Sequence, residues 1–264
     1  MGLRAERPSL EGLERLLSAF THLPYENLSK ILKYRQQRSE AIRLPDEVVE
    51  DHARFGLGGT CFSLTFFLLS LLTEAGYDAY SVLADMRYGA NTHCAAVLLW
   101  EGRKYLIDPG YLLTRPLAIH RDRISRMTTA VSTVELLFDP TDERYHLYTL
   151  QNGERKWRYV WTDAPTPMED FFSHWRDSFH WSGMRGLCLN RVADDRMVYV
   201  HKRYLRETSL SGKKSLKIKD QYHATIERVF GIRQETVEAA LAAVEENLAL
   251  DRASGLWIPK KKEA

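Results

Sequence analysis

A nearly unbroken apolar segment from Phe62 to Leu72 constrains the fold of this chain more than any other feature. Only small hydroxyl residues interrupt the segment, and Gly76 supplies a stop shortly after it. A helix that is hydrophobic on every side has to be covered on every side. The segment is shorter than the roughly 20 residues that a membrane span needs. We therefore predict a buried helix at the core of a globular protein.

A cysteine, Cys61, stands at the head of this predicted helix, directly after Gly58-Gly59-Thr60. In the first turn of a helix, unsatisfied N–H groups and the helix dipole favour a thiolate and lower the thiol pKa. The same N–H groups can hold a developing oxyanion. A free cysteine in a core helix is more often a small, inert hydrophobic residue. Cys61 alone therefore leaves both interpretations open.

Two further polar residues, His93 and Asp108, converge on one face of an apolar hairpin. The segments His93–Trp100 and Lys104–Asp108 read as strands joined by a tight loop at Glu101-Gly102. In that register His93 and Asp108 are diagonal neighbours on the same face, roughly 7–8 Å apart at the backbone. An aspartate–imidazole hydrogen bond spans that distance. The alternative is a capped strand end followed by an ordinary Asp-Pro-Gly turn.

The three residues together match the parts of a thiol-based acyl-transfer triad. Cys61 would be the nucleophile, His93 the base, and Asp108 the group that orients the base. The convergence favours this catalytic interpretation over three unrelated structural roles. Cys94 follows His93 and should point to the opposite face of its strand, so we expect it to belong to the core.

The chain divides into three regions, which predict an α+β fold. Residues 1–77 are mainly helical and carry Cys61, residues 78–165 are rich in strands and carry His93 and Asp108, and residues 166–264 are mixed and end in a helix.

Four local patterns within these regions can be compared with a structure. They are an apolar stripe at Leu10, Leu13, Leu16, Leu17 and Phe20 behind an N-cap at Ser9, a hairpin at Asn152-Gly153, a strand over Met197–Tyr204, and an inward face of the last helix at Val237, Leu241, Val244 and Leu248.

Composition excludes several other classes of protein. The formal net charge of the 264 residues is +2, too small to indicate nucleic acid or membrane as a partner. Cys61, Cys94 and Cys188 lack the paired spacing of a disulfide framework or a zinc site. The segment Met1–Glu11 mixes Arg, Glu and Pro and does not resemble a signal peptide. We expect a cytoplasmic protein without a metal.

Five segments, taken in order, resemble the arylamine N-acetyltransferase family over nearly the whole chain. Leu23–Leu28 is similar to the family's Pro-Phe-Glu-Asn-Leu segment, and Gly58–Phe62 to its nucleophile motif. His93 and Asp108 occupy the places of its histidine and aspartate, and Phe230–Ile232 resembles the Phe-Gly-Ile before its last helix.

This resemblance implies a fold and an activity. The fold is a helical bundle, a central β-barrel and a mixed C-terminal lid around a thiol-protease-like core. The activity is ping-pong transfer of an acetyl group from acetyl-CoA, a co-substrate rather than a tightly bound cofactor, through Cys61 to an arylamine or hydrazine. Gly110 and Tyr111 follow the aspartate, where the family backbone lies close to the acyl donor, and are the candidate residues for binding it.

The sequence departs from the family pattern at Leu57, Ser63, Thr65 and Leu112, where relatives usually have Arg, Glu, Asn and Gly. We therefore expect the surroundings of Cys61 to be more apolar than usual. The departures keep open an amide synthase or a thiol hydrolase that uses the same triad with another acyl donor. A non-catalytic binding module on the same scaffold is a third possibility. The acceptor amine, the acyl chain length and the oligomeric state stay open.

Overall fold

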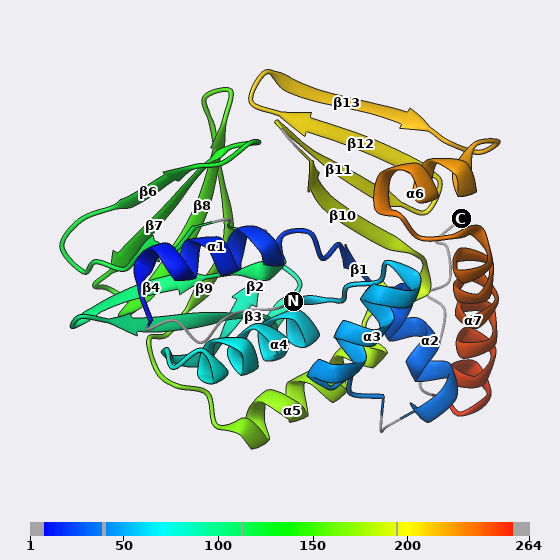
Figure 1. Cartoon of the computed structure of the whole chain (residues 1–264), viewed down its shortest axis with the longest axis horizontal. Coiled ribbons are helices and arrows are strands. Elements are labelled where there is room, and N and C mark those ends of the chain that lie inside the picture. The colour runs from blue at the N-terminus through cyan, green and yellow to red at the C-terminus, as the bar shows by residue number, and fades with distance from the viewer. Residues whose placement is uncertain (1–7, 39–40, 112, 114, 194, 256–264) are drawn as a thin grey trace.

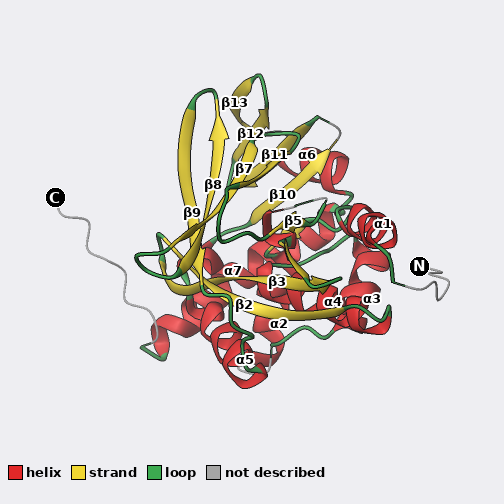
Figure 2. Ribbon diagram, turned by 90° about the vertical axis from the view of Figure 1, so that its left-hand side faces the viewer, coloured by secondary structure: helices red, strands yellow, loops and turns green. Residues whose placement is uncertain are grey.

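The computed structural model describes residues 8–38, 41–111, 113, 115–193 and 195–255, so Leu112 lies outside the described residues. An eight-stranded sheet and a five-stranded sheet stand side by side, with most of the helices beneath them (Figures 1 and 2). The predicted α+β class with a helical N-terminal region, a central barrel-like sheet and a C-terminal lid is confirmed.

Four helices form the N-terminal region: α1 (Leu10–Phe20), α2 (Leu28–Gln37), α3 (Pro45–Phe55) and α4 (Cys61–Glu74). Ser9 caps α1 as predicted, because its Oγ accepts a hydrogen bond of 3.0 Å from Gly12 N. The predicted stripe of α1 is buried except at its first residue, Leu10, which is exposed.

The apolar helix α4 is largely buried, as its sequence predicts, although Phe66, Leu69 and Leu71 are only partly buried. Phe62, Leu64, Leu68 and Leu72 are buried, and the helix contacts α3, β2 (Asp78–Met86) and β3 (Gly89–Trp100). Gly76 adopts a left-handed φ of 79° just beyond the helix end, which a residue without a Cβ reaches without strain.

The larger sheet is a nearly closed barrel with the strand order β5-β4-β3-β2-β9-β8-β7-β6. Its other members are β4 (Arg103–Ile107), β5 (Leu117–Ala118), β6 (Ser125–Thr128), β7 (Thr133–Asp139), β8 (Arg144–Gln151) and β9 (Glu154–Trp161). Trp100 pairs with Arg103, which confirms the predicted register of the β3–β4 hairpin. The predicted Asn152-Gly153 hairpin is also confirmed, with both residues at positive φ.

The C-terminal region builds the smaller sheet in the order β1-β10-β11-β12-β13. Its members are β1 (Tyr25–Glu26), β10 (Cys188–Ala193), β11 (Arg196–His201), β12 (Tyr204–Ser209) and β13 (Gly212–Lys217). The predicted strand Met197–Tyr204 is wrong in extent. The chain turns at Lys202, at a φ of 54°, so β11 ends at His201 and β12 begins at Tyr204.

Three helices and two short 3₁₀ segments complete this region: α5 (Met168–Asp177), η3 (Ser178–His180), η4 (Ser182–Arg185), α6 (Tyr222–Phe230) and α7 (Gln234–Ala253). On α7, Val237 and Val244 are buried as predicted, but Leu241 and Leu248 are only partly buried. Small residues, Ala240 and Ala243, take the central positions of the packed face. None of the helices in the described ranges combines the length and the hydropathy that a bilayer crossing requires.

Candidate active site

Cys61 is the first residue of α4, and the loop before it is clamped by the segment Leu23–Leu28. Gly59 N donates to Pro24 O at 3.3 Å, and Glu26 N donates to Gly59 O at 2.9 Å. A Cβ at Gly58 would lie 2.0 Å from Pro24 O. Only glycine permits this close approach, so the loop that presents Cys61 depends on it.

A buried ionic network supports the same loop. Glu26 is fully buried and accepts hydrogen bonds from Gly58 N at 3.1 Å and Ser29 N at 2.9 Å. Arg43 donates to Gly58 O at 2.6 Å, to Ser29 Oγ at 2.8 Å and to Asp51 at 2.7 Å. Burial raises the pKa of Glu26, and the nearby Arg43 guanidinium opposes that shift. Arg43 thus brings a buried positive charge to the nucleophile loop.

A second buried cation, Lys30, lies on the other side of the site. Its ammonium donates to Ser178 O at 2.9 Å and also to Ser178 Oγ, and it lies 4.7 Å from the ring centroid of Phe179. Burial lowers the pKa of Lys30 to about 8, although the sulfurs of Cys61 and Cys94 oppose the shift. Two buried cations, Arg43 and Lys30, thus lie near Cys61. The expectation that its surroundings are more apolar than is usual in the family stays a prediction.

Two of the unusual residues near Cys61 have structural roles. Ser63 Oγ accepts from Thr60 N and donates to Thr60 O, both at 3.1 Å, and so closes the first turn of α4. Thr65 Oγ1 donates to Cys94 O at 3.5 Å and joins α4 to β3.

His93 and Asp108 are hydrogen-bonded, as the hairpin register predicts. The distance from His93 Nε2 to Asp108 Oδ2 is 2.9 Å, and both side chains are buried. Tyr159 on β9 donates to the same Asp108 oxygen at 2.6 Å, and Tyr111 N donates to Asp108 Oδ1 at 3.1 Å. Sequence reasoning missed Tyr159, because β9 reaches this position by pairing with β2, a strand far away in the sequence.

Gly110 brings Cys61 and His93 together. A Cβ built at Gly110 would lie 2.7 Å from His93 Cε1, 3.2 Å from Asp108 Oδ1 and 3.3 Å from Cys61 Cβ. One point in space is thus in van der Waals range of all three predicted site residues. The structure brings them together, and only glycine fits between them.

The charges of the site favour a thiolate beside an imidazolium. A hydrogen bond from the Cys94 thiol lowers the pKa of Cys61 well below its ordinary value; burial opposes the shift, and the His93 hydrogen bond and charge reinforce it. Burial disfavours charge on His93, but Asp108 and Cys61 outweigh it and raise the pKa of His93 to about 10. Above the lowered pKa of Cys61 and below the raised pKa of His93, the pair exists as Cys61 thiolate and His93 imidazolium.

Tyr111 connects the site with a cleft between the barrel and the smaller sheet. Tyr111 packs edge-on against His93, with ring centroids 5.5 Å apart. It also lines a cleft of about 570 Å³ whose walls carry Thr128 and Thr129 from the barrel and Ser209 and Ser211 from the lid. Gln151 bridges the two walls by donating to Ser209 O at 2.8 Å. A neighbouring cleft of about 450 Å³ shares Ser209 and Ser211 and is lined by Arg196, Lys213 and Lys214.

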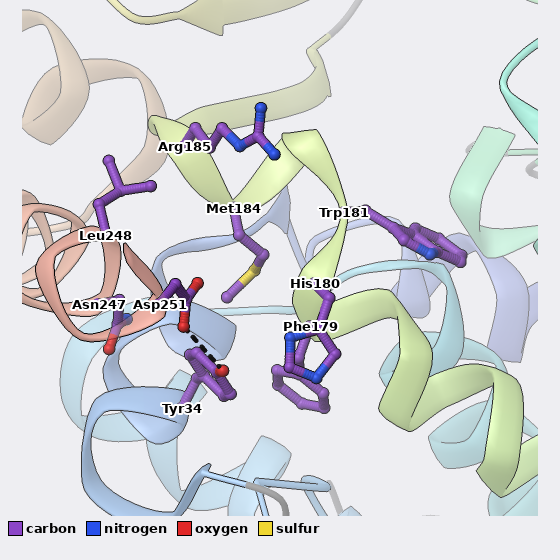
Figure 3. A pocket seen from close by; sticks show the side chains of 9 residues that line it. All are labelled: Tyr34, Phe179, His180, Trp181, Met184, Arg185, Asn247, Leu248 and Asp251. Carbon is purple, nitrogen blue, oxygen red and sulfur yellow. Dashed lines mark hydrogen bonds between the residues drawn. The ribbon is translucent and has the colours of Figure 1, made fainter. Parts of the chain in front are cut away.

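A separate, small cavity of about 10 Å³ lies between α2, α7 and the two 3₁₀ segments (Figure 3). Its lining includes Tyr34, which donates to Asp251 at 3.2 Å, and Trp181, but none of the three predicted site residues. The cavity has room for about one water molecule, so it is not a substrate site.

Comparisons with known proteins identify the family of the chain. A family model described as N-acetyltransferase matches residues 9–239. No curated protein sequence matches the chain.

Solved structures show the same fold. The arylamine N-acetyltransferase of M. smegmatis is 22% identical with a TM-score of 0.75 (93% of this chain and 94% of that chain covered), and the Salmonella typhimurium enzyme is 20% identical with a TM-score of 0.74 (94% and 93%). One from Bacillus cereus, described as having a Cys-His-Glu catalytic triad, is 18% identical with a TM-score of 0.69 (86% and 93%).

Proposed function

The chain belongs to the arylamine N-acetyltransferase family, and from this premise we propose that it is a ping-pong enzyme that uses Cys61, His93 and Asp108. Cys61 takes an acetyl group from acetyl-CoA and passes it to an arylamine or hydrazine. The observation that carries the proposal is the common approach of Cys61 and His93 to Gly110, together with the hydrogen bond of 2.9 Å between His93 and Asp108.

The first half-reaction begins from the thiolate–imidazolium pair. The Cys61 thiolate attacks the thioester carbonyl, and the resulting oxyanion is held by first-turn N–H groups of α4, for which we propose Cys61 and Phe62. These groups have no partner inside the helix. The tetrahedral intermediate collapses and expels the coenzyme A sulfur, which His93 protonates. An acetyl thioester on Cys61 and a neutral imidazole remain.

The second half-reaction uses that neutral imidazole as a base. The acceptor amine attacks the Cys61 thioester while His93 takes a proton from the amine nitrogen. The amide leaves, and the thiolate–imidazolium pair is restored. Asp108 keeps the Nε2 of His93 occupied at 2.9 Å, so the other ring nitrogen serves the reaction in both steps.

We place the acyl donor in the cleft between barrel and lid. Tyr111 links this cleft to His93, and Gly110, the residue before Tyr111, lies against Cys61. The basic side chains Lys213 and Lys214 line the adjoining cleft and suit the phosphates of the donor. We expect the reaction to run in the cytoplasm, where thiols stay reduced.

Intact-protein mass spectrometry after incubation with acetyl-CoA tests the proposal. We expect a mass gain of one acetyl group that a later addition of arylamine removes, and no gain in Cys61→Ala. Cys188→Ser is the matched control, and it should acetylate like the native chain. A Cys61 that alkylates rapidly but acquires no acetyl group would overturn the proposed donor. Full turnover by Cys61→Ala would overturn the mechanism.

A further inference from the structure

Two of the three cysteines of the chain lie side by side in the candidate site. Cys61 and Cys94 are both buried in the same apolar cluster, and each thiol shifts the pKa of the other. They come from different elements, since Cys61 begins α4 and Cys94 lies on β3. The hydrogen bond from Thr65 Oγ1 to Cys94 O, at 3.5 Å, holds β3 against the first turns of α4.

Strand β3 places two groups near Cys61, His93 on one face and Cys94 on the other. His93 packs against Tyr159 inside the barrel, with ring centroids 4.9 Å apart. Cys94 points to the other face, as alternation along a strand requires, and there it meets the helical layer rather than the barrel interior. Cys61, at the start of α4, is therefore a neighbour of the His93 imidazole from one face of the strand and of the Cys94 thiol from the other.

The two sulfurs differ in character. Cys61 is the thiolate of the site, whereas burial raises the pKa of Cys94 well above its ordinary value and keeps it a thiol. A thiolate is the form that reacts with peroxides, and a thiol beside it can condense with the oxidised sulfur. Cys188, on β10, is not part of the pair; its hydrogen-bond neighbour is Tyr199, and burial raises its pKa to about 11.

We propose that Cys61 and Cys94 form a reversible disulfide when the enzyme meets a peroxide, and that Cys94 thereby protects the nucleophile from irreversible oxidation. The inference goes beyond acyl transfer and needs only the thiol pair. Cys94 belongs to the core, as its place on the strand predicts, and is then a modification site as well.

The chemistry requires a peroxide and a reducing dithiol and balances with them. The Cys61 thiolate attacks one peroxide oxygen and the O–O bond breaks. Hydroxide departs, and Cys61 becomes a sulfenic acid. The hydroxide takes the Cys94 proton, and the Cys94 thiolate attacks the Cys61 sulfur. An S–S bond forms, the S–O bond breaks, and a second hydroxide leaves, which the imidazolium of His93 protonates. A dithiol restores both thiols by two exchange steps and is itself oxidised to a disulfide.

Alkylation and mass spectrometry after mild treatment with hydrogen peroxide test the proposal independently of any acyl donor. The native chain should lose the mass of two hydrogens, retain one alkylatable cysteine, and yield a Cys61–Cys94 cross-linked peptide. Dithiothreitol should restore all three thiols. Cys188→Ser, as the matched control, should form the same cross-link and retain no alkylatable cysteine before reduction.

In Cys94→Ala, peroxide should oxidise Cys61 further than it does in the native chain. We expect a gain of two oxygen atoms on Cys61, as a sulfinic acid that dithiothreitol does not reverse. Thermal unfolding of Cys94→Ala before oxidation shows whether the variant is folded, and Cys94→Ser supplies a polar replacement of similar size if it is not. Direct oxidation of native Cys61 to the sulfinic acid, without loss of two hydrogens, would overturn the proposal. So would equal protection of Cys61 in Cys94→Ala and in the native chain.

Discussion

Asp108 is a fully buried carboxylate held by donors from three different elements. Oδ2 accepts from His93 and Tyr159, and Oδ1 accepts from Tyr111 N. Both oxygens thus face donors, so an asparagine at this position has to turn its NH₂ group against one of them. A carboxylate, with two acceptor oxygens, therefore satisfies these donors and an amide does not.

Asp108→Asn should lower kcat/KM by on the order of 10³–10⁴-fold, because the imidazole loses the acceptor that sets its tautomer. Steady-state acetyl transfer measures the effect. Asp163→Asn is the matched control, since Asp163 also binds a tyrosine and a cation, Tyr80 and Lys104, but outside the site. Equal losses in both variants would contradict the role of Asp108.

The rate of Cys61 alkylation should depend on pH in a way that an ordinary thiol does not show. The pKa of Cys61 is lowered well below the ordinary thiol value, so its thiolate persists below that ordinary value and is lost only as the pH falls through the lowered one. Iodoacetamide kinetics, read at the Cys61 peptide, should therefore show no rise through the ordinary thiol pKa of about 8.5. His93→Ala should move the acid limb upward, and a native rate that climbs through this range would refute the ion pair.

At Gly110 even a methyl side chain should strongly reduce activity. A Cβ there would lie 2.7 Å from His93 Cε1, so Gly110→Ala has to displace the imidazole. We expect kcat to fall by about 10²-fold or more, as for small displacements of reacting groups, with little change in the unfolding midpoint. Gly183→Ala meets open space and is the control. An active Gly110→Ala enzyme would show that the ring moves freely.

At the scale of elements, the loop before α4 depends on Arg43, whose buried guanidinium donates to Gly58 O, forms an ion pair with Asp51 and stabilises the charge of the nearby buried Glu26 carboxylate. Removing one partner of a buried ion pair costs about 3–5 kcal/mol, because the other charge is left uncompensated. Arg43→Met should lower the free energy of unfolding by about this amount in urea denaturation, and the double variant with Glu26→Gln should recover part of it. Arg54→Met breaks an exposed pair with Glu50 and should cost at most about 1 kcal/mol.

Local patterns predicted most of the elements and three residues of the candidate site, Cys61, His93 and Asp108. The register of the β3–β4 hairpin placed His93 beside Asp108, and the glycines and polar cap placed Cys61 at a helix start. Short-range rules sufficed because a tight turn and a helix terminus are decided by neighbouring residues.

The missed residues share one physical reason. Tyr159, Lys30 and Arg43 reach the site through contacts between segments that lie far apart in the sequence. No periodicity signals such contacts in a single sequence. The two-residue strand β1 and the turn at Lys202 were missed for a related reason, because pairing with other strands defines them. The division into units of residues 1–77, 78–165 and 166–264 stays a prediction.

At the scale of the whole molecule, the proposed site for the donor phosphates, at Lys213 and Lys214 of the lid, is separate from the reacting groups at Cys61. Lys213→Glu with Lys214→Glu should raise KM for acetyl-CoA by about 3- to 10-fold with kcat nearly unchanged, because the charges act on binding alone. Acetyl-pantetheine lacks the nucleotide phosphates and should show no change. A similar loss with both donors would contradict this placement of the phosphates.

The short strand β1 ties the lid to the catalytic loop. Tyr25 bridges to Gly59 on one side and pairs with Asn190 of β10 on the other. We therefore expect a chimera to fail if it takes from a relative only the lid, that is, the residues after the barrel. A working hybrid has to import Leu23–Leu28 together with its lid, so these two distant stretches of sequence should change together in evolution.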